Sequence, residues 1–229
     1  MKEEKLKEIA NKIFNNIFEC DNPYNNQELL EKFAFDLNLP QEVRNQAGNP
    51  SWTSSNNAGK YISLEEVEKV EDWMQEKPEN INLEGVIAAW QKINYITTDR
   101  NYNSVNIFEC DPTEESENII KSKGVLKSKN IIFCDEVSNS EYMLASQRSA
   151  NSSYCIRVDD SANCSNSYNV VCSSKISNSL FIQDCNNLHE CMFCAHISNK
   201  KFCIANMQFE EEEYYEIKKE IIKWIMSQK

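Results

Sequence analysis

The sequence predicts an α+β protein with three parts. These are a small helical domain over residues 1–100, a short parallel β-solenoid over residues 104–207 and a C-terminal capping helix over residues 208–229. In the first part apolar residues recur at helical spacing, in the middle Ser- or Asn-led units recur about every 12 residues, and at the end an acidic stretch is amphipathic. The period of the apolar residues is the main sequence signal of secondary structure, so the change of period marks the boundaries.

Residues 1–100 predict amphipathic helices joined by polar connectors. In the first helix Leu6, Ile9 and Ile13 recur at three- and four-residue spacing, which places them on one face. A second helix is expected over residues 27–37, and Pro40 prevents it from continuing further. A loop is expected over residues 45–57, which contain Pro, Ser and Asn.

Two further helices are predicted in this region. Ser63 and Glu66 form a capping box, which opens a helix through about residue 75. Asn82 caps another helix that ends at Ile93. We expect this last helix to bury an apolar stripe, and we expect Trp73 to be a core residue as well. The members of the stripe are Val86, Ala89, Trp90 and Ile93.

The middle of the chain contains nine similar units, eight of which begin with Ser or Asn. From the third unit on, each has two apolar or thiol residues two positions apart. Residues 104–110, 116–122 and 128–134 are the most regular copies. Period-two alternation, as in Ile131 and Phe133, predicts a short strand with both side chains on one face. Asn and Ser are poor helix formers, which argues against a helical repeat.

One such strand cannot bury its apolar face alone, so stacked copies predict a β-solenoid. We expect two units in each coil of about 24 residues, giving about four to five coils and a rise of about 20 Å. Parallel crossovers are right-handed by default, and we expect that hand here.

The tail predicts a helix that begins at the acidic run 210–213, because negative charge favours a helix N-terminus. A solenoid ends in an exposed sheet edge, so this helix either caps that edge or packs along the side of the stack. Its apolar stripe consists of Tyr214, Ile217, Ile221, Trp224 and Ile225.

Composition limits the function classes. The chain of 229 residues has 36 acidic and 24 basic side chains, for a formal charge of −12, which opposes direct binding to nucleic acid and to anionic membranes. No apolar run approaches the roughly 20 residues of a membrane helix, and the N-terminus lacks a signal-peptide core. We therefore expect a cytoplasmic protein, or a virion-associated one if a phage encodes it, with ten reduced cysteines. Its four glycines, at positions 48, 59, 85 and 124, exclude a phosphate-binding loop.

Both histidines lie within one cluster, His189-x-Cys191-x-x-Cys194-x-His196, flanked by Cys185 and Cys203. Thiolate and imidazole are the natural zinc ligands, so one hypothesis is a zinc-binding or enzymatic module over residues 185–203. The alternative is that the cysteines are small buried residues of the solenoid. A redox CxxC is less favoured, because it is expected at a strand-to-helix junction that this region lacks.

Two other residues are candidates for contacting a partner. Trp52 lies in a polar loop, where a large aromatic side chain either meets a partner or anchors the loop. Arg148 follows Gln147, and this pair resembles the Gln/Arg pair on the β-helical domain of tubulin cofactor C-like GTPase activators. That resemblance implies an arginine that stabilises phosphoryl-transfer charge. The alternative is an ordinary surface arginine.

The last unit and its exit, residues 198–209, followed by an acidic helix with Tyr214 and Tyr215, resemble uncharacterised Cys- and Ser/Asn-rich repeat proteins of bacteria and their phages. The resemblance covers about the last 80 residues and implies a shared solenoid terminus. The chain is also similar to pentapeptide-repeat proteins in being an acidic coil stack, although its period differs.

No catalytic set can be assembled from the sequence, and no resident cofactor is expected unless the cluster at His189 binds zinc. We therefore expect a non-enzymatic interaction or structural protein of a phage or mobile element, which presents an acidic solenoid surface to a protein partner. End-to-end assembly of copies is a further alternative.

Overall fold

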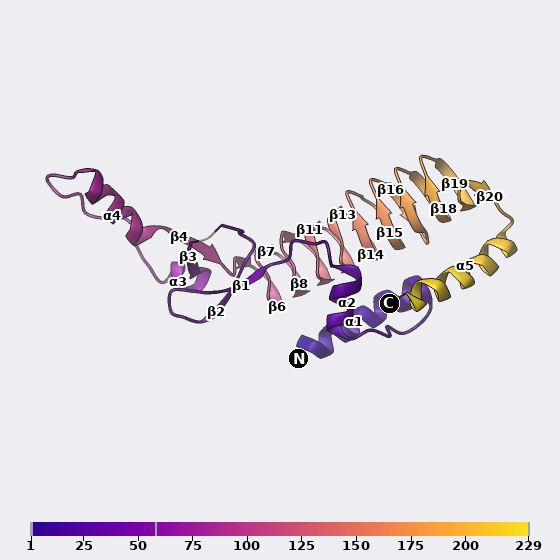
Figure 1. Ribbon diagram of the computed structural model, residues 1–229, viewed down its shortest axis with the longest axis horizontal. Helices are drawn as coiled ribbons and strands as arrows, with labels where there is room; N and C mark the ends of the chain where they lie inside the picture. Colours follow the sequence, from indigo (N-terminus) through magenta and orange to yellow (C-terminus); the bar gives the residue numbers. More distant parts are fainter. Residues whose placement is uncertain (1, 58, 229) are drawn as a thin grey trace.

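The computed structural model describes residues 2–57 and 59–228. The molecule is elongated (Figure 1): a solenoid forms one half, helices lie along one side of it, and an arm extends from its N-terminal end. The described helices are α1 (Lys2–Phe18), α2 (Asn26–Phe33), α3 (Leu64–Glu68), α4 (Leu83–Ile93) and α5 (Glu211–Ser227).

The strands divide into a few in the arm and a long parallel series in the solenoid. The arm contains β1 (Gln41–Arg44), β2 (Pro50–Thr53), β3 (Lys60–Ser63) and β4 (Tyr95–Thr98). The remaining strands are β5 (Asn101–Tyr102), β6 (Val105–Phe108), β7 (Thr113–Glu114), β8 (Glu117–Ile120), β9 (Val125–Leu126), β10 (Lys129–Ile132), β11 (Asp135–Ser138), β12 (Glu141–Leu144), β13 (Gln147–Ala150), β14 (Ser153–Asp159), β15 (Ser165–Val171), β16 (Ser174–Ser177), β17 (Leu180–Gln183), β18 (Asn186–Ala195), β19 (Ser198–Ile204) and β20 (Met207–Gln208).

Successive turns of the solenoid are 12 residues apart. Parallel pairing places Ile119 beside Ile131, and Ile131 beside Met143, so each unit lies directly on the preceding one. The β-solenoid is thus confirmed, with about nine turns over residues 101–204. The expected coil of two units is wrong, because one unit completes a turn. At about 4.8 Å for each turn, the stack is about 40 Å long, twice the expected length.

Left-handed residues make such short turns feasible. From Asn103 to Ala205 every third residue has a positive φ, with Pro112 as the only exception in this described stretch. These residues are corners, and four of them divide a turn into sides of three residues. Asn is frequent at the corners because it adopts this conformation more readily than most residues. Asn side chains also stack there, as where Asn118 donates to Asn130 at 3.0 Å.

The residue two positions before each corner points into the solenoid, and Ser or Cys at this position joins successive turns. The Ser116 hydroxyl donates to a carbonyl of its own turn at 2.7 Å and accepts the backbone N–H of Ser128 at 3.2 Å. Cys134 bonds in the same way, and its sulfur accepts the N–H of Ser146 at 3.4 Å. Buried backbone groups need such partners, which explains why Ser and Cys exchange at these positions.

Two hydrophobic cores result, one inside the solenoid and one outside it. Ile131 lies in the interior core, whereas Phe133 is a corner residue buried in the second core, under the helices. The prediction that these two side chains share a face is therefore wrong, since the period of the chain is three and not two. The second core joins one outer column of the solenoid to α1, α2 and α5. This column consists of Phe108, Ile120, Ile132, Leu144, Ile156, Tyr168, Leu180, Met192 and Ile204.

The N-terminal helices belong to this second core rather than to a separate helical domain. Helix α1 packs against β12, β14 and β15, and its buried Ile13 and Phe14 share a core with Leu144. Residues 41–98 form the arm, which mixes strands with α3 and α4. The predicted second helix ends at Phe33, four residues early, and the helix capped by Ser63 ends at Glu68. The predicted loop 45–57 contains β2.

Helix α5 takes the second of its two expected roles and packs along the side of the stack (Figure 1). The Trp224 ring centroid lies 5.9 Å from that of Phe181 and 6.3 Å from that of Phe193. At the end of the sheet β20 pairs antiparallel with Cys203 and Ile204 of β19. It covers only this part of the last polar edge, because the first four residues of β19 are exposed.

Candidate interaction surface

A buried carboxylate fixes the base of the arm to the first turn of the solenoid. Asp111 is fully buried and accepts hydrogen bonds from the Arg100 side chain at 2.9 Å through both carboxylate oxygens. It also accepts the backbone N–H of Ser54 at 2.8 Å, which follows β2. A bidentate pair of this kind is directional and strong. The arm is therefore held in a defined orientation where it meets the solenoid.

A second carboxylate ties the strands of the arm together. Asp99, just after β4, accepts the backbone N–H of Trp52 at 2.8 Å, and its second oxygen accepts from the Ser51 hydroxyl. Burial raises the pKa of Asp99 above its ordinary value, against the effect of these hydrogen bonds. Strand β3 pairs in parallel with β4, which completes a small folded unit between the solenoid and the tip of the arm.

Helix α4 lies at the far end of the arm, away from the solenoid (Figure 1). No residue of this described helix is buried, although its apolar content is high. Leu83 is 74% exposed and Trp90 is 56% exposed, and Val86 and Ile87 lie between them on the same face. The segment before α4 adds further exposed apolar side chains. These are Val70, Trp73, Met74 and Ile81.

We call these eight side chains the tip surface. A row of large exposed apolar side chains along one helix face, as on α4, marks a candidate interaction site. The prediction that α4 buries Val86 and Trp90 is wrong, as is the prediction that Trp73 is a core residue. The stripe exists at the expected positions, but the described chain provides no surface that covers it.

The charge of the chain is concentrated near this surface rather than on the solenoid. Residues 64–93 contain eight acidic and three basic side chains, whereas residues 101–204 contain 12 acidic and nine basic ones. Among the described residues, the ion pair in this segment joins Lys69 to Glu65 at 2.7 Å. The tip surface therefore lies in an acidic segment of the chain, in which eight acidic and three basic side chains give a formal charge of −5.

The structure does not bring the four predicted zinc ligands together. Cys191 and Cys194 point into the solenoid, where their sulfurs donate to backbone carbonyls at 3.5 and 3.3 Å. His189 lies outside, with its Nδ1 2.8 Å from the Ser177 hydroxyl, and His196 is an exposed corner 3.7 Å from Asp184. Among the described residues, no group of three or more His, Cys, Asp or Glu could hold a metal ion.

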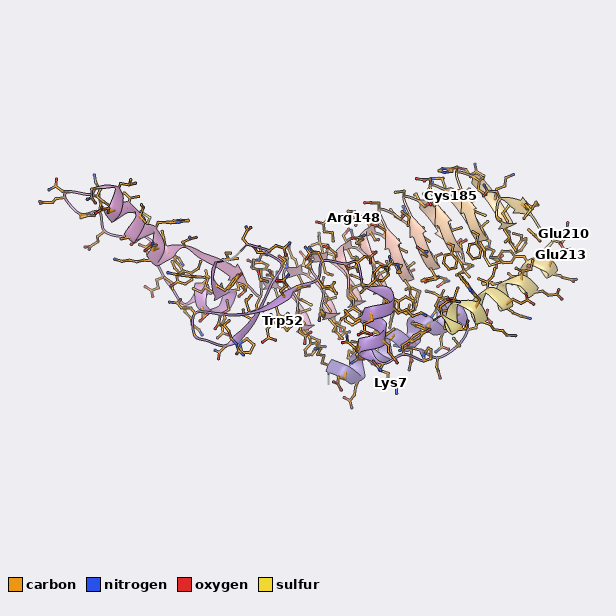
Figure 2. The ribbon with its side chains drawn as sticks, in the orientation of Figure 1. Lys7, Trp52, Arg148, Cys185, Glu210 and Glu213 are labelled. Atoms are coloured by element: carbon orange, nitrogen blue, oxygen red, sulfur yellow. The ribbon has the colours of Figure 1, made fainter. Side chains whose placement is uncertain are left out.

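The predicted partner residues Trp52 and Arg148 have structural contacts of their own. Trp52 is half-buried near the base of the arm, where its backbone N–H donates to Asp99. Arg148 is a corner residue that pairs with Asp159 and with Asp160, the latter at 2.6 Å. Figure 2 places Arg148 and Cys185 along the edge of the solenoid opposite the helices, far from Trp52. The two candidates therefore do not form one site.

Removing the carboxylate of Asp111 should loosen the arm. We expect Asp111→Ala to destabilise the junction by about 2–4 kcal/mol, somewhat below the full cost of breaking a buried pair because Arg100 is partly exposed. Hydrogen exchange at the amides of β2 and β4 measures this effect. The matched control is Asp160→Ala, which also removes an Asp–Arg pair but far from the arm. Equal protection of these amides in both variants would show that Asp111 does not hold the arm.

The cysteines should differ sharply in reactivity. All ten are free thiols, and Cys172 is the exposed one, whereas burial raises the pKa of Cys110 and Cys134 to about 12. Because the thiolate is the nucleophile, we expect one fast-reacting thiol in the folded protein and ten after unfolding. Titration with a disulfide reagent checks this, and Cys172→Ser should remove the fast phase. Fast thiols beyond Cys172 and the partly buried Cys20 would contradict the buried Cys columns.

Comparison with protein-family models found no matching family, and neither the curated proteins nor the solved structures gave a match. No helix in the described part of the chain is long and apolar enough to cross a membrane.

Proposed function

We propose that the protein is a non-enzymatic binding protein, in which the solenoid with its helices is a rigid body and the arm presents α4 to a protein partner. The single observation that carries this proposal is the exposure of the apolar stripe of α4. An apolar helix face in water costs free energy that burial against a partner recovers.

The architecture supports this division of roles. The backbone of most solenoid turns is hydrogen-bonded to the turn on either side, and α1, α2 and α5 cover the apolar outer column. The arm, by contrast, has few buried side chains among its described residues, and these lie in its strands: Ser51, Thr53, Ile62 and Thr98. Segments with few buried apolar contacts have low local stability, which is typical of binding elements.

The acidic surface that the sequence suggested for partner binding is better assigned to the arm than to the solenoid. The acidic and basic side chains of residues 101–204 nearly balance, and several pair across neighbouring turns, as Lys123 does with Asp135 at 3.2 Å. The carboxylates of residues 64–93 greatly outnumber the lysines there. Charge complementarity would thus act at the tip surface.

Quantitative affinity capture from the native host tests this function. The bait is the full chain, the test variant is Val86→Ser with Trp90→Ser, and the matched control is Val105→Ser, which removes an exposed apolar side chain from the solenoid. We expect a partner that the wild type and the control retain equally and the double variant loses. A partner that all three retain, or that the control alone loses, would place the binding site elsewhere.

A further inference from the structure

We infer that the tip surface takes a basic amphipathic helix of another protein. This inference rests on the proposed function and specifies the chemistry of its partner. It joins three observations: the spacing of the exposed apolar side chains on α4, the charge of the segment that carries them, and the isolation of α4 from the rest of the chain.

The apolar stripe of α4 has the geometry of one half of a helix pair. Leu83, Val86, Ile87 and Trp90 follow the spacing i, i+3, i+4, i+7, which places them in one row along the helix. Rows of this kind pack into the grooves of a facing helix. Trp90 is the largest of the four, and Trp is the residue type that most often anchors an interface.

The charge of the segment that carries this row favours a basic partner. Glu84 lies on α4 itself, and the chain between α3 and α4 contributes Glu71, Asp72, Glu76 and Glu79. Among the described residues, none of these five carboxylates forms a salt bridge, and the one in this segment joins Lys69 to Glu65. A second copy of the arm would bring like charges together, and an anionic membrane would be repelled. A helix with Lys or Arg beside its apolar row would gain from the same field.

Helix α4 is also poorly supported within the chain. It has 11 residues, below the length at which a helix is stable alone in water, and none of its side chains is buried. Its few tethers include the Gln75 side chain, which donates to the Ala89 carbonyl at 3.1 Å, and Lys60, which donates to the Gln91 carbonyl at 2.9 Å. A bound helix would bury the row and thereby stabilise α4.

Titration of the full chain with three fluorescent peptides tests the inference. One is a Leu/Lys peptide with Leu at i, i+3, i+4 and i+7, one is a scramble of it with the same composition, and one replaces Lys with Glu. We expect the amphipathic basic peptide to bind at least about tenfold more tightly than the other two, with an affinity that falls as salt is added. Amide exchange in α4 should slow when this peptide binds.

Two variants locate the binding. The double variant Val86→Ser with Trp90→Ser should bind the basic peptide about tenfold or more less tightly than the wild type. Val105→Ser should leave the affinity for this peptide unchanged. Circular dichroism shows whether each variant keeps the fold of the wild type. Equal binding by the scrambled peptide or by the double variant would overturn the inference, because either result would show charge attraction without a site on α4.

Other occupants would appear as different outcomes. A mass that rises with concentration in light scattering would indicate a second copy of the chain as the occupant, if the double variant abolished the rise. Co-sedimentation with phosphatidylcholine or phosphatidylserine vesicles would indicate a lipid surface, if the double variant abolished the co-sedimentation. Either result would overturn the inference of a basic helix. If no peptide binds but the double variant still loses its host partner, the inferred chemistry of the partner is wrong and the proposed function stands. If no peptide binds and the double variant also keeps its host partner, the proposed function is wrong too.

Discussion

Deleting residues 147–149 should unfold the protein or detach its helices, whereas deleting residues 141–152, one complete turn, should preserve the fold. Both deletions remove a multiple of three residues, which is the spacing between corners, so the inward side chains still point inward. Only the full-turn deletion keeps the outer column continuous. After the short deletion Ile156, Tyr168 and Leu180 move away from the helices, together with Met192 and Ile204, and their places pass to the residues three positions later.

The expected size of this effect is large. Five large apolar side chains would leave the second core, at about 1.5–3 kcal/mol for each one fully exposed, which together equals or exceeds the stability of a typical domain. The full-turn deletion removes one member of the column, Leu144, and shortens the stack by about 4.8 Å. Thermal unfolding followed by circular dichroism compares the two variants.

A one-residue deletion at Gln147 is a useful third variant, since it disturbs the inward residues as well and should be at least as damaging as the deletion of three. If the full-turn deletion were as destabilising as the short one, a single unit would not complete a turn. Tolerance of the three-residue deletion would show instead that the helices contribute little to the stability of the stack.

The sequence was sufficient to predict the solenoid but not its cross-section. The repeat is visible because the outer column and the interior columns each recur once in every unit. The size of the coil was missed because two strands and two ordinary turns need a longer chain than one unit provides. Single left-handed residues such as Asn130 turn the chain without a loop. The signal that could have revealed this is the recurrence of Ser, Cys and Ile at every third position, as at 116, 119 and 122.

The same period of three explains why the candidate zinc site was not predictable. Cys191 and Cys194 are three positions apart and therefore both point inward, while His189 precedes Cys191 by two positions and points outward. Proximity in the sequence suggested one site, but the corners separate its members. The tip surface was missed for a different reason. Periodicity identifies the apolar row of α4 correctly, yet it does not reveal whether the chain itself supplies the surface that covers the row.

Replacing Phe14 by Ala should destabilise the protein by about 3–5 kcal/mol, the usual cost for a fully buried phenylalanine. Phe14 lies at the centre of the second core, where its ring centroid is 5.5 Å from that of Phe18, 6.0 Å from Tyr24 and 5.9 Å from Phe33. Two of these neighbours continue to the solenoid, since Phe18 and Phe33 both contact the ring of Tyr168. Removing Phe14 therefore weakens the attachment of α1 and α2 to the stack.

Urea unfolding of the full chain measures this loss, and Phe35→Ala is the matched control. The Phe35 side chain is 70% exposed and its main partner is the Arg157 guanidinium, 4.8 Å from the ring centre, so its removal should cost at most about 1 kcal/mol. Similar losses in the two variants would mean that the helices are not bound through this core. A separate early transition in the Phe14 variant would show that they detach before the solenoid unfolds. That order would be expected, because the interior core contains no residue of α1 or α2.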